Sequence, residues 1–397
     1  MAVRKRLPKV LVALLVSVVL CDLGVSLFLI RDGLFLGVPL PPFGALTHPR
    51  QERWVEALGQ DPATTRGNGR FDAELGWTWK RSSVDDEGVH INALGARGER
   101  AYAAEKPPGV TRVLTFGDSF TFCDDIPDRF AFQRLLEHRH ADFEVLNFGV
   151  SGYGTDQALL RFRRLGTELD ADVVAIGILL ENIGRNVNRF RPLWSTRTGF
   201  CATKPRFVLE DGTLQLVPQP FADQLALRDA LLDGSVLESV AEHEYWLGRP
   251  HVPTGRLSGL VRVAAGWLAE RERTPWRLWL DPEGEPFRTT VAVLERFHAE
   301  ALASGATLAP ILIFPTRADL DRAMDGERTW DGLLDALGAR GLEAIDLSVP
   351  LAARERELRA DPEAGSLYFK SHLSSVGNSV VADTLYDWID ERLDPDR

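Results

Sequence analysis

Two kinds of hydrophobic run divide the chain. The first extends from Val10 to Ile30 and is apolar over 21 positions, apart from Asp22 and a few small residues. The later runs are shorter, begin at Arg112, and alternate with stretches whose apolar residues recur at helical spacing. Short apolar runs that end at turn residues are typical of buried strands. The pattern therefore predicts one membrane-length helix followed by an α/β domain.

The order of elements predicts the class of the domain. Alternating strands and helices favour a parallel sheet with helices on both faces. The stretch 172–179 is the most continuous apolar run of this part, which is typical of a central strand buried on both faces. The helix near 156–165 is expected to begin at a Thr155 or Asp156 cap. The expected strands are 112–116, 143–148, 172–179, 308–314 and 342–347, and the expected helices are 130–139, 156–165, 291–303, 330–340 and 374–393.

The N-terminal run predicts a membrane anchor within residues 1–32. About 20 apolar residues span a bilayer as a helix. Basic residues at positions 4, 5, 6 and 9 precede the run, so the N-terminus is expected to stay cytoplasmic and the rest to be periplasmic. A cleaved signal peptide is the main alternative, but no small-x-small site follows the run. Asp22 either shortens the span or faces a partner helix.

Residues 33–109 are expected to be a linker and a lead-in segment, beginning with the Pro/Gly-rich stretch 37–44. The domain proper is expected over 110–397, with a mainly helical insertion at about 185–285. Five of the ten tryptophans fall in this region, enough apolar bulk to pack as a lid over substrate or as a decorative insertion. The basic stretch from Arg185 to Arg191 is expected to be a solvated start to this insertion, with substrate binding as the alternative.

Charge and cysteine content exclude some classes of function. A net charge of −11 over 397 residues argues against nucleic acid as the main partner, because a phosphate backbone requires a basic face. Cys21, Cys123 and Cys201 have no metal-ligand spacing. Export would allow Cys123 and Cys201 to form a disulfide; two unrelated small buried residues are the equal alternative.

Polar residues suited to acyl transfer follow the expected strands. Ser119 comes just after the first strand in Gly117-Asp118-Ser119, at the sheet edge where α/β folds bind ligands. Asp118 is expected to be a turn former. A glycine-rich loop at 147–154 includes Gly152, Asn182 follows the third expected strand, and His372 precedes the last helix. These residues supply a nucleophile, two oxyanion donors and a base once each.

In these motifs the sequence resembles the SGNH, or GDSL-type, hydrolases. Gly117-Asp118-Ser119 matches the first block of that family, the loop from Asn147 to Gly152 the second, Asn182 the third, and His372 the last. The resemblance covers roughly residues 110–393 without the insertion. It implies a flavodoxin-like fold with a five-stranded parallel sheet, no metal or cofactor, and ester hydrolysis or acyl transfer. The oxyanion donors would be Ser119 N–H, Gly152 N–H and the Asn182 side chain.

The sequence departs from the family pattern in two places. The third block usually reads Gly-x-Asn-Asp, and here only Asn182 is kept. The triad acid normally lies two or three residues before the histidine, where this chain has Lys370 and Phe369. A backbone carbonyl, or Asp361 or Glu363 folding back, would have to replace it. Loss of the acid lowers the rate by several orders of magnitude, so a weakened enzyme and an inactive relative are both hypotheses.

Together these observations predict a membrane-anchored serine esterase that acts on an acyl ester, such as an acetyl ester, of a glycan or envelope component. An O-acyltransferase of the same fold, which modifies an exported polysaccharide, is the alternative, because the chemistry is shared up to the acyl-enzyme. A non-catalytic envelope binding or scaffold protein is the hypothesis from another class.

Overall fold

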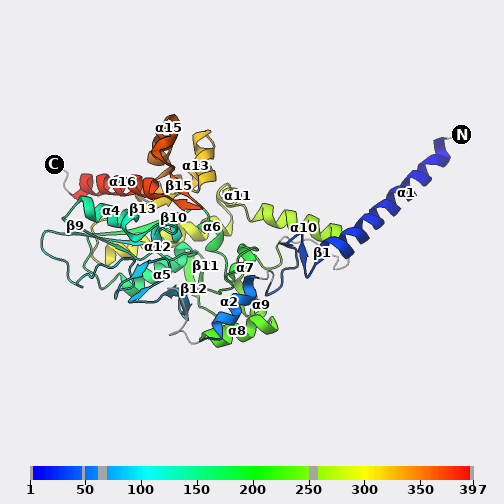
Figure 1. Ribbon diagram of the computed structural model, residues 1–397, viewed down its shortest axis with the longest axis horizontal. Coiled ribbons are helices and arrows are strands. Elements are labelled where there is room, and N and C mark those ends of the chain that lie inside the picture. Colours follow the sequence, from blue (N-terminus) through cyan, green and yellow to red (C-terminus); the bar gives the residue numbers. More distant parts are fainter. Residues whose placement is uncertain (1–2, 47–49, 61–68, 250–257, 394–397) are drawn as a thin grey trace. The chain divides into compact units, whose positions relative to one another are not determined.

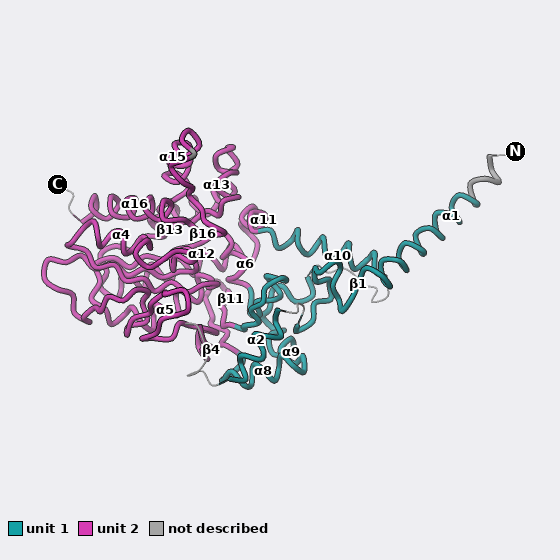
Figure 2. The backbone as a smooth tube through the Cα atoms, viewed as in Figure 1, with its two compact units in different colours: residues 1–61, 188–203, 220–274 teal, residues 62–187, 204–219, 275–397 magenta. Residues whose placement is uncertain are grey.

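The computed structural model describes residues 3–46, 50–60, 69–249 and 258–393 (Figure 1). The chain forms two compact units, coloured separately in Figure 2. Unit 1 comprises residues 1–61, 188–203 and 220–274, and unit 2 comprises residues 62–187, 204–219 and 275–397. The expected insertion, at about 185–285, is thus divided between the two units. Its residues 188–203 and 220–274 belong to unit 1, and the rest of it belongs to unit 2.

Unit 2 contains a five-stranded parallel sheet in the order β14-β13-β10-β8-β9. In chain order this is 5-4-3-1-2, the flavodoxin-like arrangement, so the expected fold class is confirmed. The central strand β10 is buried at all seven positions, as its continuous apolar run predicts. The strands are β8 (Thr111–Phe116), β9 (Phe143–Asn147), β10 (Val173–Leu179), β13 (Ile311–Phe314) and β14 (Ala344–Asp346).

Helices cover both faces of this sheet because successive side chains of each strand point to opposite sides. Leu114 and Phe116 of β8 enter one apolar cluster, with α5 (Thr155–Leu165), α12 (Glu285–Ala303) and α14 (Asp331–Gly338). Val113 enters the other, with α4 (Phe132–Arg139), α15 (Ser348–Ala360) and α16 (Ser375–Leu393). The site described below lies where β8 and β10 end.

Smaller elements of unit 2 surround the sheet. They are the helices α3 (Ser119–Phe122), α6 (Asn182–Arg185), α11 (Pro275–Trp279) and α13 (Arg317–Met324), the short helices η2 (Asp128–Phe130) and η4 (Pro362–Ala364), and the paired strands β4 (Gly69–Asp72) with β5 (Gly76–Trp79), β6 (Ser83–Val84) with β7 (His90–Ile91), β11 (Arg206–Glu210) with β12 (Thr213–Val217), and β15 (Tyr368–Phe369) with β16 (His372–Leu373).

The sequence pattern missed several of these elements. The hairpin β11–β12 lies within the region expected to be mainly helical, and the helices α13 and α15 were not expected. Helix α5 is capped at Gly154 rather than at Thr155 or Asp156, which form its first turn. The carboxylate of Asp156 instead forms a buried ion pair with Lys204, a tertiary contact that local patterns do not reveal.

Unit 1 is mainly helical and includes the N-terminal helix. Residues 37–44, expected to be a linker, supply β3 to a small three-stranded sheet. Two of the tryptophans of the expected insertion, Trp194 and Trp246, pack against each other with ring centroids 4.9 Å apart. The elements are α1 (Val3–Gly24), η1 (Val25–Leu29), β1 (Ile30–Arg31), β2 (Leu34–Phe35), β3 (Val38–Pro39), α2 (Arg50–Leu58), α7 (Arg191–Trp194), α8 (Gln224–Asp233), α9 (Val236–Val240), η3 (Ala241–His243) and α10 (Gly259–Glu272).

Among the residues that the structure describes, one helix is long and apolar enough to cross a membrane, over Lys9–Leu29, and no part of that stretch is buried within the protein. This agrees with the expected anchor in length and composition. Cys123 and Cys201 are both free and buried, so of the two interpretations offered for them the disulfide is wrong.

Candidate active site

The turn that carries Ser119 is built by a glycine and a helix cap. Strand β8 ends at Phe116, and Asp118 caps the short helix α3 by accepting a hydrogen bond from Phe120 N at 2.9 Å. Ser119 is therefore the first helical residue after the strand. A Cβ at Gly117 would stand 2.1 Å from Thr121 Oγ1 and 2.9 Å from Gly177 O. Only glycine allows this tight passage from strand to helix, which sets Ser119 at the carboxyl edge of the sheet.

A buried polar network fixes Asp118. Its Oδ2 accepts hydrogen bonds from Asn182 Nδ2 at 2.9 Å and from Arg185 Nη1 at 3.1 Å. Asp118 is fully buried and Arg185 is nearly so, so this charge pair is shielded from water and strengthened by additional hydrogen bonds. Asp118 thus acts as a turn former, as expected. The expectation that the basic stretch is solvated is wrong for Arg185, because its guanidinium lies against the turn that carries Ser119.

The histidine is oriented by a carboxylate that the sequence analysis did not consider. His372 begins β16 and places Nδ1 2.6 Å from Asp125 Oδ2. Lys370 donates to the other oxygen of this carboxylate at 3.1 Å. Partial burial tends to raise the pKa of Asp125, but the hydrogen bonds from His372 and Lys370 outweigh it and lower that pKa. The carboxylate is therefore ionised at neutral pH beside the imidazole.

Of the acids named from the sequence, Asp361 caps the short helix η4 by accepting from Glu363 N at 3.3 Å. The hydrogen bonds and ion pairs described for His372 include neither Asp361 nor Glu363. Phe369, three residues before the histidine, pairs with it in the β15–β16 hairpin. Asp125 lies in the turn after α3 and has a φ of 69°. Such left-handed backbone is uncommon outside glycine, asparagine and aspartate.

A second carboxylate, Asp124, lies on the opposite side of the imidazole. Its Oδ2 is 3.9 Å from His372 Nε2, and its Oδ1 accepts from Ser151 Oγ at 2.7 Å. Burial raises the pKa of Asp124, against the effects of Ser151 and His372. His372 thus stands between two carboxyl groups of adjacent residues, one hydrogen-bonded and the other outside hydrogen-bond distance.

The structure brings Ser119 and His372 into neighbouring segments. The ring of Phe120, the residue after Ser119, is 5.3 Å from the imidazole between centroids. The hydrogen bonds described for the His372 ring are those with Asp125 and Ser371, and one with Ser119 Oγ is not among them. Contacts between a catalytic base and nucleophile are often long before substrate binds. The pairing of Ser119 with His372 stays a prediction.

The glycine-rich loop after β9 is held against α3. Asn147 Oδ1 accepts from Gly149 N at 3.0 Å and its amide donates to Phe122 O at 3.3 Å. A Cβ at Gly149 would stand 2.4 Å from Phe122 N, so the close approach of this loop to α3 requires glycine. Gly152 has a φ of 82°, which also favours glycine. Its role as an oxyanion donor stays a prediction.

The amide of Asn182 is engaged inside the protein. Nδ2 donates to Asp118 Oδ2 at 2.9 Å and to Tyr153 O at 3.2 Å, and Oδ1 accepts from Leu179 N at 3.1 Å. Since an amide nitrogen has two hydrogens, both are used in this arrangement. Asn182 therefore joins the ends of β8 and β10 and the glycine-rich loop, and it can reach an oxyanion only by exchanging one of these bonds.

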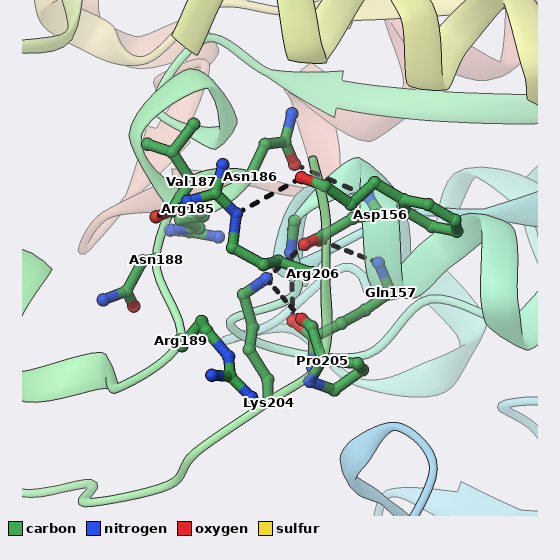
Figure 3. A network of polar contacts seen from close by, with 12 residues as sticks. Asp156, Gln157, Arg185, Asn186, Val187, Asn188, Arg189, Lys204, Pro205 and Arg206 are labelled. Carbon is green, nitrogen blue, oxygen red and sulfur yellow. Dashed lines mark hydrogen bonds and ion pairs between the residues drawn. The ribbon is translucent and has the colours of Figure 1, made fainter. Parts of the chain in front are cut away.

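A further buried network supports the loop that carries Asn182. Asn186 Oδ1 accepts from Thr155 N at 2.8 Å, and its amide donates to Thr290 Oγ1 at 2.9 Å. Beside it, Lys204 forms a fully buried ion pair with Asp156 (Figure 3). Burial raises the pKa of Asp156, although the nearby ammonium group of Lys204 opposes that shift. The loop after β10 is thus rigid, as a site that must hold its groups in place requires.

A cavity of about 290 Å³ opens beside Asp124 and Asp125, which form part of its wall. Trp79 and Phe122, whose ring centroids are 4.8 Å apart, form another part. The remaining lining residues are Asp85, Glu87, Val89, Arg97, Ile126 and Pro127. The described residues contain no group of three or more His, Cys, Asp or Glu side chains arranged to hold a metal ion.

Comparisons with known proteins show remote similarity in structure alone. No family model and no curated protein match the chain. Matching solved structures include a lipolytic protein of the G-D-S-L family from Veillonella parvula, at 12% identity, with 72% of this chain and all of that chain covered and a TM-score of 0.33. A catalytic mutant of an acetylxylan esterase from Geobacillus stearothermophilus matches at 13% identity, with 70% and 94% covered and a TM-score of 0.35.

An alpha/beta hydrolase from the metagenome of Lake Arreo matches at 11% identity, with 70% and 94% covered and a TM-score of 0.36. The G-D-S-L family named for the first of these structures is the one that the motifs of this chain resemble. At such scores the activity of none of them transfers to this chain, and the residues around Ser119 and His372 must carry the functional conclusion.

Proposed function

We propose that this protein is a membrane-anchored serine esterase in which Ser119 is the nucleophile, His372 the base and Asp125 the carboxylate that orients the base. The observation that carries the proposal is the 2.6 Å hydrogen bond between His372 Nδ1 and Asp125 Oδ2. This hydrogen bond gives His372 a carboxylate partner. The lack of an acid at the position usual for the family had made an inactive relative a serious alternative.

The geometry of that bond supports a role in catalysis. An ionised carboxylate can only accept hydrogen bonds, so it keeps the imidazole proton on Nδ1. The lone pair of Nε2 is then available to take a proton from a hydroxyl group. Asp125 also stabilises the imidazolium that forms when His372 accepts that proton. Both effects require a charged carboxylate, in agreement with the lowered pKa of Asp125.

The proposed reaction has two stages. Ser119 Oγ attacks the ester carbonyl while its proton passes to His372 Nε2, and the imidazolium then gives that proton to the leaving alcohol. Water, activated by the same imidazole, hydrolyses the acyl-enzyme and regenerates Ser119. The proposed oxyanion donors are Ser119 N–H, Gly152 N–H and the amide of Asn182. For Asn182, we propose that the oxyanion replaces Tyr153 O as partner, while the bond to Asp118 keeps the amide in place.

We place the enzyme at a membrane, with its catalytic part on the periplasmic side. The apolar stretch Lys9–Leu29 has the length of a bilayer span, and the basic residues before it favour a cytoplasmic N-terminus. The end of this helix also contacts the folded protein, since Asp22 Oδ1 accepts from Ser258 Oγ at 2.8 Å and from Leu260 N at 2.9 Å. A helix that is part of the fold supports an uncleaved anchor over a signal peptide.

The proposed substrate is an acyl ester of a glycan or envelope component. The cavity beside Asp125 is lined by Trp79 together with Asp85 and Glu87. Apolar faces with a few convergent polar groups are typical of small-molecule sites, and this combination suits a ring that bears hydroxyl groups. Acetylated sugars, the substrates named for the acetylxylan esterase above, are therefore the first to test.

A fluorophosphonate probe tests the nucleophile. The full chain in detergent is expected to be labelled, and Ser119→Ala and His372→Ala are expected to lose the label. Equal labelling of the wild type and Ser119→Ala would refute the enzymatic proposal and favour a non-catalytic binding protein. Acetyl release from an acetylated glycan, measured with and without an unacetylated glycan acceptor, then separates hydrolysis from transfer. An O-acyltransferase would release little acetate alone and acetylate the acceptor.

A further inference from the structure

Helix α10 begins at the end of the apolar N-terminal helix. Asp22 of α1 accepts hydrogen bonds from Ser258 Oγ at 2.8 Å and from Leu260 N at 2.9 Å, and Ser26 Oγ accepts from Gly259 N at 2.9 Å. The first N–H groups of a helix have no partner within the helix. Here one of them is satisfied by Asp22 of α1 and another by Ser26 of η1, and the carboxylate of Asp22 faces the positive end of the α10 dipole. Asp22 thus faces a partner helix, one of the two readings offered for it from the sequence.

This junction sets the depth of α10. Leu29, the end of the apolar stretch, lies seven positions after Asp22, which is about 10 Å of helix at 1.5 Å per residue. If Lys9–Leu29 spans the bilayer, Asp22 lies two thirds of the way along the span, and the first turn of α10 lies at the same depth. Figure 1 shows the two helices meeting at this end of α1.

The exposed face of α10 is apolar. Val261, Trp267 and Leu268 are 36%, 63% and 36% exposed, and Ala264 between them is also exposed. Positions 261, 264 and 268 recur at the spacing of one helical face. The opposite face is buried, where a Cβ at Gly266 would stand 2.7 Å from Leu40 Cδ2. This exposed stripe adjoins α1, whose side chains are also apolar and exposed.

The stripe ends in a charged turn, where Glu270, Arg271 and Glu272 are all exposed. The guanidinium of Arg271 lies 5.6 Å from the ring centroid of Trp267. Tryptophan is enriched at the level of lipid headgroups, where its ring is half in apolar surroundings, and a basic residue beside it suits the phosphates. The stripe therefore changes from aliphatic to aromatic to charged with increasing distance from Asp22.

We infer that α10 is a second membrane element, whose face of Val261, Ala264, Trp267 and Leu268 rests in the bilayer leaflet where α1 ends. The inference depends on the anchor included in the proposed function, but not on the esterase activity. The occupant is a lipid surface. Hydrogen bonds join the start of α10 to the end of the span, so the stripe is continuous with the exposed apolar surface of the span. A second copy of the chain is the competing occupant.

Lipid quenching of a fluorophore tests the inference. The full chain carries Cys21→Ser, so that Cys123 and Cys201, both buried, are the remaining native cysteines. An environment-sensitive dye is attached at Ala264→Cys, and at Leu232→Cys as the matched control, an exposed residue of α8 in the same unit. Both variants are reconstituted into phosphatidylcholine and phosphatidylglycerol vesicles, with and without brominated lipid.

We expect the dye at 264 to have blue-shifted emission that brominated lipid quenches several-fold more than the dye at 232. Equal, water-like emission at both positions would overturn the inference. Blue-shifted emission at 264 without lipid quenching would also overturn it, in favour of a protein partner. In a separate sample of the chain with native Cys21 and neither added cysteine, the dye on Cys21 reports the span itself. If that position also escapes quenching, the anchor is refuted and α10 with it, whereas fluorophosphonate labelling of Ser119 tests the catalytic proposal separately.

Discussion

Replacement of Asp125 tests how the catalytic histidine is oriented. In Asp125→Ala, the 2.6 Å bond to His372 Nδ1 is lost. A hydrogen bond to a charged group contributes about 1.5–3 kcal/mol, which alone corresponds to a decrease in kcat of about 10- to 150-fold. Loss of the fixed orientation of the imidazole adds to this decrease, toward the several orders of magnitude known for triads without their acid. Asp124 remains 3.9 Å from Nε2 and does not replace the bond, because it lies on the other side of the ring.

Asp125→Asn is expected to be more damaging than Asp125→Ala, although it is nearly isosteric. If the new amide donates to Nδ1, the imidazole proton moves to Nε2, and His372 can no longer accept a proton from Ser119. The wrong tautomer of a triad histidine lowers kcat by about 10⁴-fold. We therefore expect a loss of about 10³- to 10⁴-fold for the asparagine variant.

The assay is kcat and KM for a small acetyl ester, with circular dichroism to confirm folding. Asp361→Asn, at the candidate acid position that the structure places in a helix cap, is the matched control and should keep wild-type kcat. Lys370→Met removes an ion pair in which the lysine side chain is 61% exposed and should change kcat less than about fivefold. Wild-type kcat in Asp125→Asn, or an equal loss in Asp361→Asn, would refute the assignment of the acid.

Three further predictions concern folding. Burial raises the pKa of Asp124, so its contribution to wild-type stability should fall as the pH rises from about 4 through that pKa. Asp124→Asn should therefore raise Tm at pH 7 but not below about pH 4. A scan of Tm against pH checks the sign. Lys204→Met leaves the buried carboxylate of Asp156 unpaired and should cost about 3–5 kcal/mol in urea unfolding, much of it recovered by adding Asp156→Asn. Gly149→Ala would place Cβ 2.4 Å from a backbone nitrogen of α3 and should abolish probe labelling, whereas Gly338→Ala, with nothing within 4 Å, should be neutral or stabilising.

The sequence by itself determined the elements whose signals are local. The apolar runs at 112–116 and 172–179 predicted buried strands, and the alternation of strands and helices predicted the parallel sheet. Gly117-Asp118-Ser119 was located at a strand end because a glycine and a capping aspartate act on their immediate neighbours. Hydrophobic periodicity and turn chemistry are properties of a few consecutive residues, and so they can be read without a structure.

Only the tertiary structure decided which distant groups meet. Asp125 and His372 are 247 positions apart, and no spacing along the chain distinguishes Asp125 from Asp124, although the two face different nitrogens of the same ring. Asp22, anomalous in an apolar helix, is explained by the N-terminus of a helix that begins 237 residues later. Charges such as these are stable only where the fold supplies a partner, and the identity of that partner is a consequence of packing rather than of local pattern.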